Sequence, residues 1–195
     1  MSRLFTAALL VSLPALAATT LDKVPPEEGG ESSGLLMRVV QYEGSINGAI
    51  TIEVQNPSGA PQTFSARGLY FVPQLNPNQA PQRLGVVGPF RVKGLIEWVE
   101  QLDIAPGGSE RLTLDVYCID SHRHSPSQKT PFRVAKDRLP VTLTKAIDIA
   151  ATQSAQPYGG VSAPAARAAV QGEVWKSRDA KWIKLDGESK QEAGK

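Results

Sequence analysis

The sequence has only one cysteine, Cys118, in 195 residues. A single cysteine cannot form a disulfide within the chain, so the disulfide framework that is typical of small exported domains is excluded. Cys118 is therefore a buried and unreactive side chain, is paired with another molecule, or is used in chemistry. The first state is the most common, because free cysteine is among the most buried residue types.

Long apolar runs are absent after the first seventeen residues, "MSRLFTAALLVSLPALA". Arg3 precedes the apolar stretch, and residues 15–17 form the small-x-small pattern of a cleavage site, which predicts a secretory signal peptide. We therefore expect an exported protein that is periplasmic, secreted or associated with the cell surface. No cysteine follows the expected cleavage site directly, and no later segment is apolar enough to span a bilayer. Neither a lipid anchor nor membrane insertion is expected after cleavage.

Neither sign of charge is in excess. Cleavage of the signal peptide removes Arg3 and no acidic residue, which leaves 20 basic and 19 acidic side chains. A nearly neutral chain lacks the electrostatic footprint of a protein that binds nucleic acid or an anionic membrane surface. We therefore expect no nucleic-acid partner, and instead expect an unidentified protein or surface ligand.

The middle of the chain consists of short runs rich in β-branched residues, separated by turns of Gly, Pro and Asn. Residues 50–55 alternate between apolar and polar side chains. The clearest run has one wholly apolar face: Leu112, Leu114, Val116 and Cys118. The pattern predicts a mainly β fold, an immunoglobulin-like antiparallel β-sandwich. The Cys…Trp…Cys framework of antibody domains is missing, which excludes a domain of that type.

Two helices are predicted after residue 135, packed on the sandwich. In the first, Leu143, Ile147 and Ala150 recur at helical spacing. Ser162 as N-cap and Pro164 in the first turn mark the start of the second. The second helix carries one stripe of residues, flanked by Val174: Ala168, Gln171 and Trp175. Gly172 weakens this helix by about 1 kcal/mol relative to Ala, which suggests a local need for a small residue.

The expected organisation follows from these shifts in composition, and no internal repeat is found. It comprises a signal peptide (1–17), a flexible N-terminal arm (18–33), a β-sandwich (34–134), a helical C-terminal part (135–188) and a polar tail (189–195).

The segment "LTLDVYCIDSHRHSPSQKTPF" contains Cys118 and the only two histidines, His122 and His124. Together with Asp120 these side chains are plausible metal ligands, and His-x-His is a known zinc spacing on extended backbone. The alternative is two solvated loop histidines, because "SHRHSPS" is rich in loop-forming residues.

A Cys–His nucleophile is a further hypothesis, with Asp120 or Asp137 orienting the histidine. Catalytic cysteines usually lie at electropositive helix N-termini, whereas Cys118 lies on the core face of a predicted strand. We therefore expect no catalytic residues, no cofactor and no enzymatic activity.

Two separate segments, "YCID" (117–120) and "AVQGEVW" (169–175), together resemble the thioester domains of bacterial surface adhesins. In that family a Tyr-Cys segment supplies the cysteine and a helical Gln-x-x-(Val/Ile)-Trp segment supplies the glutamine. The resemblance implies a bond between the Cys118 sulfur and the side-chain carbonyl of Gln171, formed with loss of ammonia. Val174 and Trp175 match the positions that pack the helix over this bond, and Tyr117 precedes the cysteine.

The expected function is an exported binding protein of the cell envelope or surface that attaches to its target covalently, through a Cys118–Gln171 thioester. Burial would keep water from the thioester until an amine or hydroxyl arrives, and His122 or His124 could take the proton of that nucleophile. Two alternatives stay open. One is a structural or assembly module with a buried, inert cysteine, and the other is a small metal-binding protein using His122 and His124.

Overall fold

The computed structural model describes residues 20–44, 48–92 and 97–194. The predicted signal peptide lies outside these ranges. Within them, none of the helices has the length and apolar character needed to cross a membrane.

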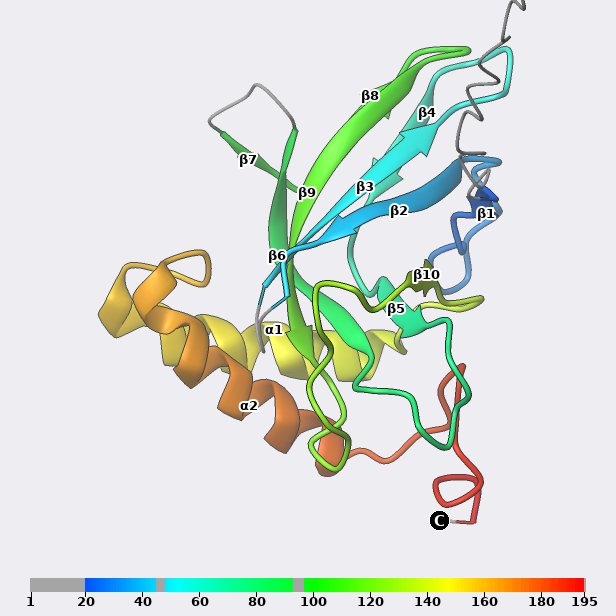
Figure 1. The fold of residues 1–195 in the computed structure, drawn as a ribbon. Helices are drawn as coiled ribbons and strands as arrows, with labels where there is room; N and C mark the ends of the chain where they lie inside the picture. The colour runs from blue at the N-terminus through cyan, green and yellow to red at the C-terminus, as the bar shows by residue number, and fades with distance from the viewer. Residues whose placement is uncertain (1–19, 45–47, 93–96, 195) are drawn as a thin grey trace, which may run out of the picture.

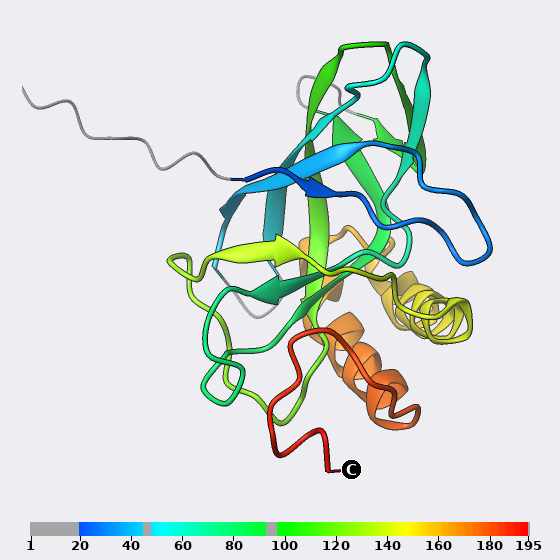
Figure 2. The ribbon, with the colours of Figure 1, turned by 90° about the vertical axis from the view of Figure 1, so that its right-hand side faces the viewer.

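One antiparallel sheet of eight strands dominates the fold (Figure 1). Its strand order is β1-β2-β3-β9-β6-β5-β10, with β7 added on β6, and β4 pairs with β8 in a separate small sheet. The strands are β1 (Asp22–Lys23), β2 (Leu36–Tyr42), β3 (Ala49–Gln55), β4 (Gln62–Ser65), β5 (Tyr70–Pro73), β6 (Leu84–Val92), β7 (Trp98–Val99), β8 (Gln101–Ile104), β9 (Ser109–Cys118) and β10 (Phe132–Val134). The sheet curves strongly, so that its inner face encloses a core (Figures 1 and 2).

Side-chain alternation along the strands fills this inner core. The predicted inward face of β9 is confirmed, since each of its apolar residues is fully buried: Leu112, Leu114, Val116 and Cys118. Ile50, Ile52 and Val54 of β3 are fully buried in the same cluster. Edge-to-face aromatic pairs close it, with ring centroids 5.4 Å apart for Tyr42 and Phe132.

Two helices cover the outer face of the sheet (Figure 1). They are α1 (Val141–Ala155) and α2 (Arg167–Asp179), with short 3₁₀ turns at Gln156–Tyr158 and Pro164–Ala166. A second core forms where Tyr117 of β9 and Ile119, directly after it, meet Leu143 of α1 and Val170 and Val174 of α2. The expectation of a mainly β, antiparallel fold followed by two C-terminal helices is therefore confirmed. The finer assignment of an immunoglobulin-like topology stays a prediction.

The helices differ from the sequence prediction in detail. Ser162 is not an N-cap: a 3₁₀ turn begins at Pro164, α2 begins at Arg167, and neither start has a side-chain cap. The buried stripe of α1 continues from Ile147 to Ala151 and Ala155 instead of through Ala150. In α2, Ala168 is exposed, and the buried residues are Val170, Gln171, Val174 and Arg178.

The stretch expected to be a flexible arm contributes to the packed fold. β1 pairs with β2, and Val24 is 3 % exposed in the inner core. Arg138 donates from Nε to the carbonyl of Pro25, at 3.0 Å. The Glu28 carboxylate accepts the backbone N–H of Val141 at 2.9 Å, so the arm supplies a hydrogen-bond acceptor for the start of α1.

Candidate functional site

Helix α2 brings Gln171 to Cys118, the pair expected to react. The backbone N–H of Cys118 donates to Oε1 of Gln171 at 3.0 Å, and Nε2 of Gln171 donates to the backbone carbonyl of Cys118 at 2.7 Å. Cys118 is 0 % exposed and Gln171 is 3 % exposed. Two residues that are 53 positions apart therefore form a contact in a buried environment.

The end of β9 explains why these backbone groups are available. On one side Cys118 faces Leu84, and the ladder with β6 continues through Ile119 N–H, which donates to the carbonyl of Arg83 at 3.0 Å. On the other side the described ladder with β3 ends at Ala49, opposite Asp115. The polar backbone groups of Cys118 point to this second side, because they alternate along a strand. The carboxamide of Gln171 thus occupies the place of a neighbouring strand.

The thiol of Cys118 lies in the inner core, among the apolar residues of the curved sheet. Burial, and in second place the negative charge of Asp120, raise the pKa of the thiol to about 12. The thiol is therefore protonated at neutral pH, and reagents in solution have no direct path to it.

Val174 and Trp175 pack on opposite faces of the sheet. Val174 is fully buried in the outer core, which also contains Tyr117. Trp175 packs against the inner core that contains Cys118, and its indole N–H donates to Oε1 of Gln82 at 3.0 Å. Helix α2 therefore straddles the end of β9, with Gln171 between these two anchors.

Tyr117 fixes the connection that precedes α2. Its hydroxyl donates to the carbonyl of Val161 at 3.3 Å. Burial raises the pKa of this phenol to about 12, although Arg167 acts in the opposite direction. The phenol is consequently neutral, and it contributes packing and one hydrogen bond.

Asp120 and His122 belong to a second cluster, centred on the buried Arg83. Asp120 accepts three hydrogen bonds from Arg83, from the backbone N–H (3.0 Å), from Nε (2.7 Å) and from one terminal nitrogen (2.6 Å). Nε2 of His122 lies 2.6 Å from Oε1 of Glu192, which also accepts from Arg83 at 3.0 Å. Arg123 pairs with the same carboxylate.

Glu192 comes from the segment expected to be a polar tail, yet it is 3 % exposed. Burial alone would raise the pKa of its carboxyl. Hydrogen bonds from Arg123, the Ser189 backbone and His122, with the charge of Arg83, instead hold that pKa well below its ordinary value. Glu192 therefore stays ionised and anchors the C-terminal segment.

The contacts of this cluster bear on the expected metal ligands. Asp120, His122 and Glu192 offer ligand atoms within 4.8 Å of one another, but His124 is not part of this group. The backbone carbonyl of His124 accepts the N–H of Gln82. Both carboxylates already accept guanidinium N–H groups, so a cation placed there would meet the positive charges of two arginines. These carboxylates therefore belong to a network of ion pairs with Arg83 and Arg123, and not to a set of free metal ligands.

The C-terminal segment is tied to the same end of the sheet. The backbone N–H of Asp186 donates to the Tyr70 hydroxyl at 2.9 Å, and its carbonyl accepts from Arg83 at 3.1 Å. Its carboxylate accepts from Arg133 at 2.8 Å. Burial and Arg133 act in opposite directions on the pKa of Asp186, and the net effect lowers it. Residues beyond α2 therefore bind to Arg83 just before β6, to Tyr70 of β5 and to Arg133 of β10.

Sequence reasoning identified Cys118, Gln171, Asp120 and His122 but missed Arg83 and Glu192. The signal was weak in both cases, because Arg83 stands at the start of an apolar run and Glu192 stands in a polar stretch. Comparisons of this chain with models of known families, with curated proteins and with solved structures give no match.

Proposed function

We propose that this chain is an exported binding protein of the cell envelope or surface that attaches to its target through an internal thioester between Cys118 and Gln171. One observation carries the proposal. The backbone of the only cysteine and the side chain of a glutamine 53 residues later are hydrogen-bonded, and both residues are almost completely buried. The likeness of the two segments to thioester domains points to the same bond, and the apolar signal-like start of the chain supports export.

The reaction balances with groups that the chain provides. The sulfur of Cys118 attacks the side-chain carbonyl carbon of Gln171, the carbon–nitrogen bond breaks, and ammonia leaves with the thiol proton. When a target amine arrives, its nitrogen attacks the same carbon, the carbon–sulfur bond breaks, and the sulfur regains a proton. The target is then held by an amide bond to residue 171.

Two features of the site favour this chemistry. The Cys118 N–H already donates to Oε1 of Gln171, the oxygen that becomes negative when the carbonyl carbon is attacked. A preorganised donor of this kind lowers the barrier to acyl transfer. The apolar surroundings of the sulfur exclude water, which protects a thioester from hydrolysis.

The test is the intact mass of the purified protein without its signal peptide, before and after treatment with methylamine. The thioester predicts a mass that is short by one ammonia. Methylamine then converts it to the plain mass plus one methylene, because the amine nitrogen replaces that of Gln171. Cys118→Ala and Gln171→Ala must both show their plain masses. A parent protein with the plain mass, unchanged by methylamine, would exclude the thioester.

A second candidate function is favoured by the same two hydrogen bonds. They satisfy both backbone groups of Cys118, so Gln171 is fully accounted for as a structural bracket in an envelope module with an inert cysteine. This candidate predicts the plain mass together with a thiol that reacts with iodoacetamide only after denaturation. Free reactivity of Cys118 in the folded protein would contradict both candidates.

A further inference from the structure

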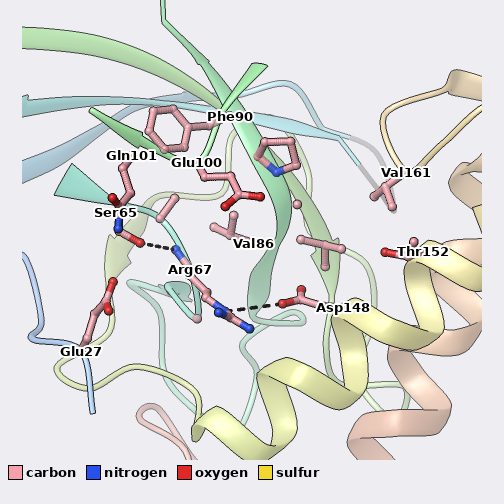
Figure 3. A pocket seen from close by; sticks show the side chains of 15 residues that line it. Glu27, Ser65, Arg67, Val86, Phe90, Glu100, Gln101, Asp148, Thr152 and Val161 are labelled. Atoms are coloured by element: carbon pink, nitrogen blue, oxygen red, sulfur yellow. Dashed lines mark hydrogen bonds and ion pairs between the residues drawn. The ribbon is translucent and has the colours of Figure 1, made fainter. Parts of the chain in front are cut away.

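A pocket of about 370 Å³ opens between the curved sheet and α1 (Figure 3). Its wall includes β6, the turn between β4 and β5, and the exposed side of α1. Neither Cys118 nor Gln171 lines it. Its volume falls in the range of small-molecule sites, roughly 300–1,000 Å³.

A bulge in β6 shapes one wall. The register with β9 shifts between Val86 and Phe90, and Gly88 within the bulge has a φ of +80°. A side chain at that φ is strained, so glycine permits this local path. The bulge turns an apolar surface toward the pocket, formed by Val86, Val87, Pro89 and Phe90. Bulges are enriched beside binding sites because they redirect side chains in this way.

Acidic groups outnumber basic ones on the polar side. Arg67 lies 3.7 Å from the Asp148 carboxylate, and Glu100 approaches from the other side of the pocket (Figure 3). Burial, and in addition the negative charge of Glu100, raise the pKa of Asp148, although Arg67 opposes them. Among the described residues Glu100 has no ion pair. A cation that entered the pocket would therefore meet the carboxylate of Glu100 without a competing ion pair.

The strand behind the bulge carries a further buried acid, which pairs with Arg167. Asp115 lies on β9 between the two partners of the shifted register, and its side chain is 3 % exposed. One of its carboxylate oxygens has no hydrogen-bond partner among the described residues. Buried acceptors are normally paired, so this oxygen is an exception, although Asp115 itself does not line the pocket.

We propose that this pocket binds an alkylammonium group, a positively charged amine on a short apolar chain. The apolar wall receives the chain, and the ammonium lies between Glu100 and Asp148. A lysine side chain of a partner protein and a small free amine share this chemistry. The proposal does not depend on the thioester, since the two sites have no residue in common.

The experiment uses the signal-free chain carrying Cys118→Ala, so that no amine can react covalently at position 118. Backbone amide resonances of Gly68, Gly88 and Thr152, which line the pocket, are followed by NMR during titration with n-butylamine. Butyrate and n-butanol match the probe in length but carry a negative charge or no charge. We expect saturable shifts at these residues with butylamine alone.

Variants then test the carboxylates. The double variant Glu100→Gln, Asp148→Asn should weaken butylamine binding by roughly two- to thirtyfold, the range expected for the loss of two partly exposed ion pairs. Glu43→Gln, which removes an exposed acid outside the pocket, should leave it unchanged. Tighter binding of Nα-acetyl-lysine N-methylamide than of butylamine supports a protein lysine as the natural ligand, and equal binding supports a free amine. Unsaturable shifts, equal binding of butyrate or n-butanol, or unweakened binding by the double variant would overturn the proposal.

Discussion

At the residue scale, the side-chain amide of Gln171 forms the two hydrogen bonds with the backbone of Cys118 that a neighbouring strand would otherwise form. Gln171→Leu keeps the approximate volume but leaves the N–H and carbonyl of Cys118 buried without partners. We expect the free energy of unfolding to fall by about 2 kcal/mol or more, because two buried backbone groups lose their hydrogen bonds. Urea denaturation measures the change, in a Cys118→Ala background so that loss of a thioester does not contribute.

The matched control is Gln153→Leu, on the exposed side of α1. An exposed substitution should change stability by less than about 0.5 kcal/mol. If both variants lose the same small amount, the two hydrogen bonds of Gln171 contribute little, and the bracket interpretation is wrong.

The sequence allowed the contact of Cys118 with Gln171 to be expected, because two short motifs pointed to it. The contact between Arg83 and Glu192, which lie 109 positions apart in the sequence, could not be predicted in this way. An ion pair between two distant residues produces no repeating pattern in the sequence from which it could be predicted. Composition indicated only that a lysine- and glutamate-rich C-terminus is usually solvated, and tertiary contacts override that tendency here.

At the scale of elements, α2 carries Gln171 beside a glycine, a residue of low helix propensity. Gly172 follows Gln171, and a Cβ built on Gly172 would meet no atom within 4 Å. The structure therefore gives no steric reason for glycine. Gly172→Ala should raise the free energy of unfolding by up to about 1 kcal/mol, since alanine restricts the unfolded chain and favours the helix. Thermal and urea unfolding measure the gain.

Gly187→Ala is the contrasting variant for this prediction. Gly187 has a φ of +73°, and a Cβ there would collide with the side chain of Val72. It should be destabilising where Gly172→Ala is stabilising. A loss of stability in Gly172→Ala would show that α2 needs glycine for a reason other than packing.

Period-two alternation predicted the inner faces of β3 and β9, because each strand buries one complete face. The start of α2 and the buried face of α1 were predicted less well from the sequence. The sequence from Ser162 to Pro164 has the composition of a helix start, but the chain first makes a 3₁₀ turn and α2 begins three residues after Pro164. On α1, the buried apolar residues recur every four positions, at Leu143, Ile147, Ala151 and Ala155, so the stripe passes through Ala151 instead of Ala150.

For the whole molecule, the C-terminal segment fixes the arrangement of sheet and helices. Arg83, directly before β6, donates to Asp120 after β9 and to Asp186 and Glu192 near the end of the chain. Arg83 and Glu192 are both almost fully buried. A buried charge that loses its partner is strongly destabilising, so the segment is coupled to the stability of the whole fold.

This coupling gives a prediction for the dependence of stability on pH. The pKa of Glu192 lies below its ordinary value of 4.5 in the folded protein. Its ionised form therefore contributes stability above the unfolded pKa, and that contribution is lost as the pH falls through and below it. Glu192→Gln should lower the free energy of unfolding by roughly 3–5 kcal/mol at pH 7, because Arg83 and Arg123 lose a charged acceptor.

The difference between the parent and Glu192→Gln should shrink as the pH is lowered from 5 towards about 2, since the parent then loses the same charge. Asp115 and Asp148, whose pKa values are raised by burial, act in the opposite direction. They are present in both proteins, so their effect cancels in the difference. Urea unfolding across this range measures it, with the exposed Glu43→Gln as the control that should show no such trend. A difference that stays constant with pH would mean that Glu192 stabilises the fold through packing and neutral hydrogen bonds, and the C-terminal segment would then not be held by charge.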